Sequence, residues 1–79
     1  MMQEIGLHEL EVGQRATVLS LHMIGQMRRR LLDLGITEQG IVECVGRAPS
    51  GDPIAFLIRG AVVALRVDDC RRISVRRME

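Results

Sequence analysis

The chain has 79 residues, of which 47% are hydrophobic and 27% are charged, and its formal net charge at pH 7 is +1. A chain of this length folds as one domain with a modest core, burying about 60–65% of the surface that the unfolded chain exposes. These values exclude a two-domain enzyme, a disordered tail and a polybasic nucleic-acid arm. All 11 basic residues are Arg, which excludes chemistry that needs a Schiff-base or phosphate-loop lysine.

Three further features narrow the class of protein. Phe56 is the only aromatic residue, so the chain lacks the stacking platform of proteins that bind single-stranded nucleic acid. Two cysteines are too few for a disulfide-stapled secreted protein, although one bridge is allowed by arithmetic. The first ten residues do not form a signal peptide, and no apolar run is long enough to cross a bilayer. We therefore expect a soluble cytoplasmic protein, with no nucleic-acid partner and no membrane insertion.

A short apolar turn is predicted ahead of the first strand. Leu7, Leu10 and Val12 are its apolar residues, and we expect the turn to dock on the core. The alternating run 15–21 then predicts a strand, with positions 16, 18 and 20 on one face and positions 17, 19 and 21 on the other.

One helix is predicted, from Ile24 to Leu34. The apolar residues of this run recur at helical spacing and should form a single stripe: Ile24, Met27, Leu31 and Leu34. Gly35 is suited to the left-handed conformation that ends many helices, and Ile36 is placed to fold back on Leu31, as in a Schellman motif.

Short runs rich in β-branched residues predict four more strands: Ile41–Val45, Ile54–Ile58, Val62–Val67 and Arg72–Arg76. Asp68 and Asp69 are placed to cap one helical turn that ends near Cys70. About five strands with a helical insertion make a mainly β fold, and a small, partly open barrel hides strand edges that would otherwise pair with other chains. We expect one domain over residues 1–79, with its core at about 7–76. Edges left exposed can support weak self-association.

Three consecutive arginines are the strongest local signal for a binding surface. Guanidinium groups bind anions, so Arg28, Arg29 and Arg30 are candidate partner-binding residues. Consecutive helix residues point about 100° apart, however, and do not all face one target. The alternative is a solvated helix face on which Asp33 pairs with Arg29 and Arg30.

The loop 47–53 is the second candidate surface. It lacks lysine and precedes a strand, so it does not fit a phosphate-binding loop. Its prolines restrict the backbone and Gly51 permits a turn, which predicts a rigid loop that displays side chains. The candidate partner-binding residues of this loop are Arg47, Pro49, Asp52 and Pro53.

No paired metal-binding or catalytic motif occurs in the sequence. We predict no built-in cofactor or metal site, and only His8, Glu9 and His22 are weak metal-ligand candidates. Cys44 and Cys70 fit buried small hydrophobic residues better than ligands. The serines have no recognisable base nearby: Ser20, Ser50 and Ser74. We therefore predict that the chain is not an enzyme.

Several segments form a specific combination that covers most of the chain, from about Leu7 to Val75. They are LHEL at 7–10 with Gly13, RRRLLDLGI at 28–36, RAPSGDPI at 47–54, ALR at 64–66 and ISV at 73–75. In this order and spacing they resemble the FeoA family of small ferrous-iron transport accessory proteins. The resemblance implies an SH3-like β-barrel with helical insertions.

The resemblance also implies a function. Members of the family are cytoplasmic partners of the membrane ferrous-iron transporter FeoB, so we expect this chain to bind and regulate the cytosolic region of FeoB. One alternative is a regulatory module that acts in trans, because a similar SH3-like domain resembles the C-terminal domain of iron-dependent repressors. The other is a carrier that binds Fe(II) itself, with His8, Glu9 and His22 as the nearby ligands; Fe(II) is otherwise expected only as a weak or indirect ligand.

Overall fold

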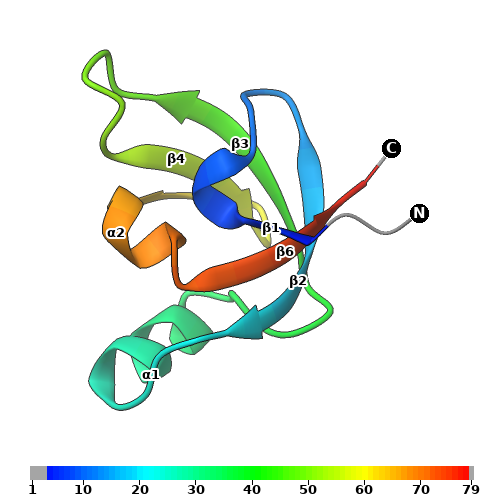
Figure 1. The fold of residues 1–79 in the computed structure, drawn as a ribbon, viewed down its shortest axis with the longest axis vertical. Helices are drawn as coiled ribbons and strands as arrows, with labels where there is room; N and C mark the ends of the chain where they lie inside the picture. The colour runs from blue at the N-terminus through cyan, green and yellow to red at the C-terminus, as the bar shows by residue number, and fades with distance from the viewer. Residues whose placement is uncertain (1–3, 79) are drawn as a thin grey trace.

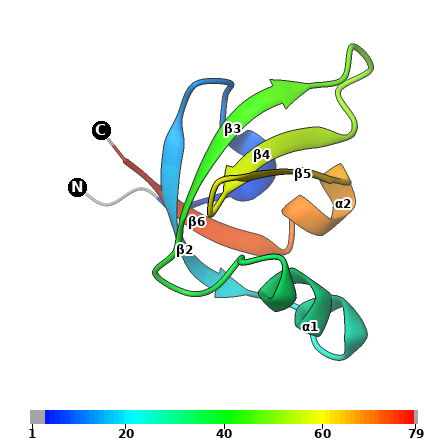
Figure 2. The same cartoon turned by 180° about the vertical axis from the view of Figure 1, so that it is seen from behind.

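Six strands, two α-helices and one 3₁₀ helix make up the computed structural model, which describes residues 4–78 (Figure 1). In chain order the elements are β1 (Glu4–Gly6), η1 (Leu7–Glu9), β2 (Arg15–Leu21), α1 (Gln26–Asp33), β3 (Ile41–Arg47), β4 (Ile54–Ile58), β5 (Ala61–Leu65), α2 (Val67–Cys70) and β6 (Ile73–Arg77). All pairings are antiparallel, in the order β1-β6-β2-β3-β4-β5. Figure 2 shows from behind how the sheet curls around its core. The prediction of a mainly β fold with a helical insertion is confirmed.

The strand that the sequence does not indicate is β1. It has three residues, too few to show an alternating pattern, and its Ile5 lies opposite Val75 of β6. The predicted boundaries also shift at β5. The predicted strand 62–67 is too long, because β5 ends at Leu65 and the chain enters α2 at Val67. The helical turn ending at Cys70 is confirmed.

A β-bulge changes which residues of β2 face the core. The pairing of β2 with β6 shifts between Val18 and Ser20, so Leu19 is the extra residue. Strict alternation places Leu21 on the face opposite Val18, and this prediction is wrong, because both side chains are buried. A second shift of this kind lies in β3.

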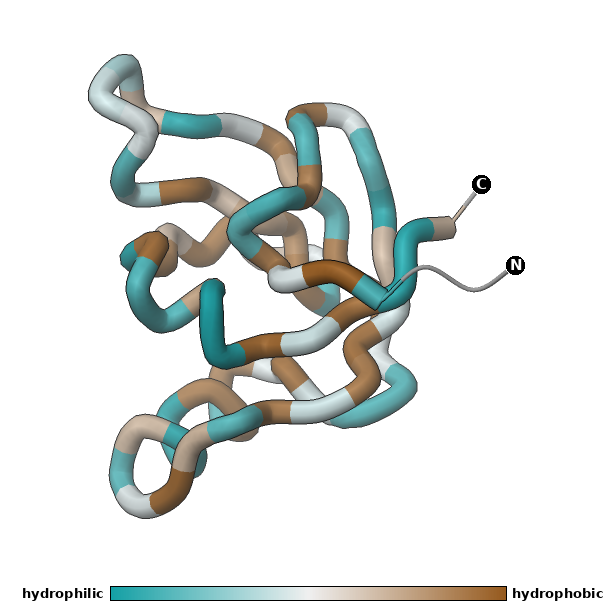
Figure 3. Tube along the Cα trace, in the orientation of Figure 1, coloured by the Kyte–Doolittle hydropathy of each residue, from teal (hydrophilic) through white to brown (hydrophobic). Residues whose placement is uncertain are grey.

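The core lies inside the curled sheet and receives side chains from both sheet and helices. Figure 3 shows apolar residues alternating with polar ones along much of the strands. The largest side chain of the core is that of Phe56, which is fully buried. Cys44 and Cys70 are also buried and are not joined by a disulfide. From the predicted apolar turn, Leu7 and Leu10 enter the core, whereas Val12 is 58% exposed.

The helix α1 ends as predicted but begins later. The Ile36 N–H donates to the Leu31 carbonyl oxygen (2.9 Å) and the Gly35 N–H to that of Leu32 (3.0 Å), which is the Schellman pair of hydrogen bonds. Leu31 is buried, but Ile24, predicted on the same stripe, is 89% exposed. Ile24 precedes the helix, and a break at Gly25 (φ 78°) separates it from the helical stripe.

Candidate functional site

The three consecutive arginines do not share one surface. Arg28 and Arg29 line a shallow hollow of about 660 Å³ on the outer side of α1. The remaining lining residues are Gly25, Gln26, Leu32 and Asp33. Arg30 lies outside this lining, because the helical rotation of about 100° per residue carries it around α1. The structure therefore brings two of the three predicted arginines together.

The hollow combines cationic and apolar groups. Arg28 is half-buried and its Nη1 donates to the Leu21 carbonyl oxygen (3.4 Å), which ties the side chain to the end of β2. Arg29 is exposed, and within residues 4–78 no ion pair joins Asp33 to Arg29, nor to Arg30. The predicted pairing of Asp33 with these arginines is therefore absent from the structure.

In the loop 47–53, Arg47 is used for internal contacts. Its Nη2 donates to the carbonyl oxygens of His8 (3.1 Å) and Leu10 (3.3 Å), and its Nη1 donates to that of Gly51 (3.4 Å). A guanidinium has five N–H donors, so one side chain satisfies carbonyls from two segments. Arg47 thus ties the end of β3 to the segment around η1.

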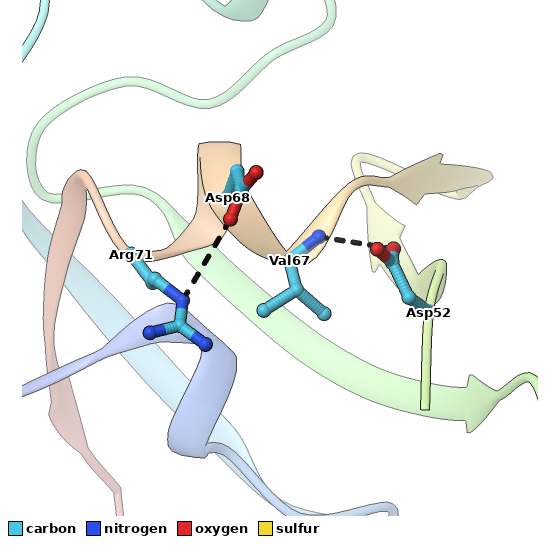
Figure 4. Close-up of polar contacts among 4 residues, drawn as sticks. All are labelled: Asp52, Val67, Asp68 and Arg71. Atoms are coloured by element: carbon cyan, nitrogen blue, oxygen red, sulfur yellow. Dashed lines mark hydrogen bonds and ion pairs between the residues drawn. The ribbon is translucent and has the colours of Figure 1, made fainter. Parts of the chain in front are cut away.

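Asp52 also serves the fold. Its Oδ1 accepts a hydrogen bond from the Val67 N–H (3.1 Å), the first donor of α2, as Figure 4 shows. The prediction that Asp68 and Asp69 cap this helical turn is wrong, because α2 begins at Val67 and both aspartates lie within it. Asp68 instead forms an exposed ion pair with Arg71 (3.9 Å). Both prolines of the loop, Pro49 and Pro53, are exposed.

The three metal-ligand candidates are not assembled into a site. Glu9 accepts a hydrogen bond from the Gly6 N–H (2.9 Å) through Oε2, and His8 lies beside it on η1. His22 lies after β2, where it contacts other side chains. No group of three or more His, Cys, Asp or Glu side chains placed to hold a metal ion occurs within residues 4–78. The Fe(II) carrier stays an untested alternative without a preformed donor set.

The contact that sequence reasoning missed is a serine–histidine cluster. The His22 Nε2 lies 2.9 Å from the Oγ atoms of both Ser20 and Ser74. The prediction that these serines have no base nearby is therefore wrong. The opposition of Ser20 and Ser74 across β2 and β6 brings the cluster together, and only the sequence spacing Ser-x-His hinted at it. Nucleophilic catalysis also needs a group that orients the base, and no hydrogen bond to the second ring nitrogen is formed within the described chain.

The buried thiol of Cys70 has a shifted acidity. Burial raises its pKa from 9.0 to about 12, and the neighbouring Asp69 carboxylate adds to the shift. A thiol with such a pKa stays protonated at neutral pH, and it is the thiolate that reacts or ligates metals. Cys70 is therefore a packing residue, in agreement with the sequence prediction.

The sequence of the chain matches a known domain family over nearly its whole length. The profile of the FeoA domain aligns with residues 5–77. The chain belongs to the FeoA family. A curated relative, the Fe(2+) transport protein A/Fe(2+) transporter FeoB fusion protein of Porphyromonas gingivalis, is 32% identical over 69 residues. The alignment covers 87% of this FeoA-family chain but only 8% of the fusion protein.

Solved structures agree with this FeoA assignment. The FeoA-like protein of Clostridium acetobutylicum superposes with a TM-score of 0.88 at 33% identity, covering 100% of this chain and 92% of that one. Zinc-complexed FeoA of Stenotrophomonas maltophilia is described as a prokaryotic SH3 domain protein. It superposes with a TM-score of 0.79 at 28% identity, covering 90% of this chain and 88% of that one. The predicted SH3-like fold is thereby confirmed.

Metal-dependent repressors share the FeoA architecture. A manganese-dependent transcriptional repressor superposes with a TM-score of 0.85 at 22% identity, covering 99% of this chain and 44% of the repressor. At this identity the likeness shows the fold alone.

No helix within residues 4–78 is long and apolar enough to cross a membrane.

Proposed function

We propose that this chain is a non-enzymatic, cytoplasmic accessory protein of ferrous iron transport that binds the cytosolic region of a FeoB transporter and regulates it. The observation that carries the proposal is the Porphyromonas gingivalis fusion protein, in which a segment 32% identical to this chain is joined to an Fe(2+) transporter. Fusion holds two domains at a high effective concentration, which favours even a weak contact between them. A separate chain of the same family would make that contact as a partner in trans.

The structure supports a binding role over a catalytic one. The conspicuous polar residues of the loop 47–53 hold the fold together, as the contacts of Arg47 and Asp52 show. The hollow on α1 instead carries Arg28 and Arg29 beside apolar surface on a rigid scaffold. Such a surface is suited to a protein partner.

A binding titration tests the proposal. The purified chain is titrated against the cytosolic G-protein region of FeoB from the same organism, with and without guanine nucleotide and with and without Fe(II). We expect saturable binding whose affinity changes with the bound nucleotide, which is the behaviour of a regulatory subunit. Absence of binding under all four conditions, and to the intact transporter in detergent, would overturn the proposal.

A further inference from the structure

We propose that one face of α1 is the docking surface for FeoB and that it receives an acidic segment carrying an apolar anchor side chain. This α1 face consists of Arg28, Arg29 and Leu32, which line the hollow, and of Ile24, which precedes the lining residue Gly25. The inference rests on the proposed function, and it adds the location of the interface and the chemistry of the partner.

The positive charge of the α1 face favours a partner that carries carboxylates. Arg28 and Arg29 supply two guanidinium groups, and neither forms an ion pair with a carboxylate within residues 4–78. The contact of Arg28 Nη1 with the Leu21 carbonyl orients its side chain and leaves further N–H donors for a partner. Asp33 on the rim is the one acidic residue of the lining, so the hollow keeps a positive excess. Guanidinium groups bind carboxylates in a bidentate manner, which makes an acidic segment the complementary partner.

Exposed apolar side chains on the same face favour a partner that contributes an apolar anchor side chain. Ile24 is 89% exposed, the highest value among the exposed large apolar side chains of the described chain, and Leu32 is 37% exposed. Leu32 lines the hollow together with both arginines, and Ile24 is the sequence neighbour of Gly25, which also lines it. Interfaces draw their affinity chiefly from apolar and aromatic anchors, while charged groups set orientation and association rate.

Two alternatives are less well supported: docking through the loop 47–53, and self-association through the α1 face. Arg47 and Asp52 already hold internal hydrogen bonds, so binding through them would disrupt contacts of the fold. Two α1 faces packed against each other would bring Arg28 and Arg29 of one copy against those of the other. Such like-charge contacts disfavour a homodimer, whereas an acidic partner relieves the charge.

The test compares charge-reversal variants in the FeoB titration. The double variant Arg28→Glu with Arg29→Glu is matched by the control Arg15→Glu with Arg66→Glu, which has the same net charge. The control changes two exposed arginines away from α1, one on β2 and one between β5 and α2. We expect the α1 variant to bind at least about tenfold more weakly and to lose most of its dependence on ionic strength. The matched control should stay within about twofold of the wild type.

A second pair tests the apolar anchor. Ile24→Ser should weaken binding at least about fivefold, whereas Val62→Ser, at an exposed site on β5, should leave it unchanged. Circular dichroism and thermal unfolding establish that each variant is folded. If the wild type binds and both α1 variants bind equally well, the inference is wrong and the proposed function stands. If the wild type itself does not bind, the proposed function fails and the inference fails with it.

Discussion

Gly35 combines two constraints in one residue. Its φ is 102°, a conformation that costs other residues backbone strain, and a Cβ there would lie 3.0 Å from Arg59 Cδ and 3.1 Å from Ile58 Cγ2. We therefore expect Gly35→Ala to lower the free energy of unfolding by about 1–3 kcal/mol, measured by urea denaturation.

A matched substitution separates backbone strain from crowding at this site. Gly51 has a φ of 93°, and a Cβ added there meets nothing within 4 Å. Gly51→Ala should therefore show the backbone cost alone, about 1 kcal/mol. Equal losses for the two variants would show that the contact with Arg59 and Ile58 contributes nothing.

The Cys70 thiol makes stability depend on pH in the alkaline range. Its pKa is about 12 in the folded chain and 9.0 in the absence of the fold, so above pH 9 the unfolded state loses its proton first. The contribution of Cys70 to the free energy of unfolding should consequently be constant below pH 9 and fall between pH 9 and 12, at no more than about 1.4 kcal/mol per pH unit. Urea midpoints from pH 7 to 10.5 measure this slope. Cys70→Ala should flatten it, and an unchanged slope in that variant would assign the loss to other groups.

At the scale of elements, α2 depends on a side chain that is distant in sequence. The Asp52 Oδ1 accepts the first N–H of this four-residue helix from 15 positions away. Asp52→Ala should cost about 0.5–2 kcal/mol of unfolding free energy, as the loss of a helix cap does. Asp52→Asn keeps an acceptor oxygen and should recover most of it. If both variants lose the same amount, the charge of Asp52 matters and the hydrogen bond does not.

Elements set by local chemistry could be predicted from the sequence. The Schellman end of α1 follows from Gly35 and Ile36 alone, and the short strands follow from β-branched runs. The misplaced details arise from long-range pairing. The bulge at Leu19, which brings Leu21 to the core, is set by the register against β6. Likewise, the contact of Asp52 with α2 exists only once the sheet has curled.

The same division between local and long-range features applies to the candidate site. Helical rotation alone indicated that three consecutive arginines diverge, and the structure separates Arg30 from the other two. The internal role of Arg47 could not be foreseen, because two of its three acceptors, the carbonyl oxygens of Leu10 and His8, lie 37 and 39 residues away. The exposure of Ile24 was missed because periodicity treats a residue before the helix as part of the stripe.

For the molecule as a whole, a single core implies one cooperative unfolding transition. Phe56 is its largest fully buried side chain. Phe56→Ala should cost about 3–5 kcal/mol, a large part of the stability of a domain this small. Phe56→Leu should lower the free energy of unfolding by less, so it can be measured even if the alanine variant does not fold. Far-ultraviolet circular dichroism and thiol accessibility should report the same midpoint; separate midpoints would contradict a single core.

The two ends of the described chain leave the barrel next to each other. Glu4 of β1 lies opposite Arg76 of β6, and Figures 1 and 2 both show the ends on one side, away from α1. The molecule measures 32 Å along its longest axis. A domain attached at either end would therefore need a tether of roughly ten extended residues to reach the α1 face of its own chain. A shorter tether would leave that face open to the transporter domain of a neighbouring molecule, so tether length decides between docking in cis and docking in trans.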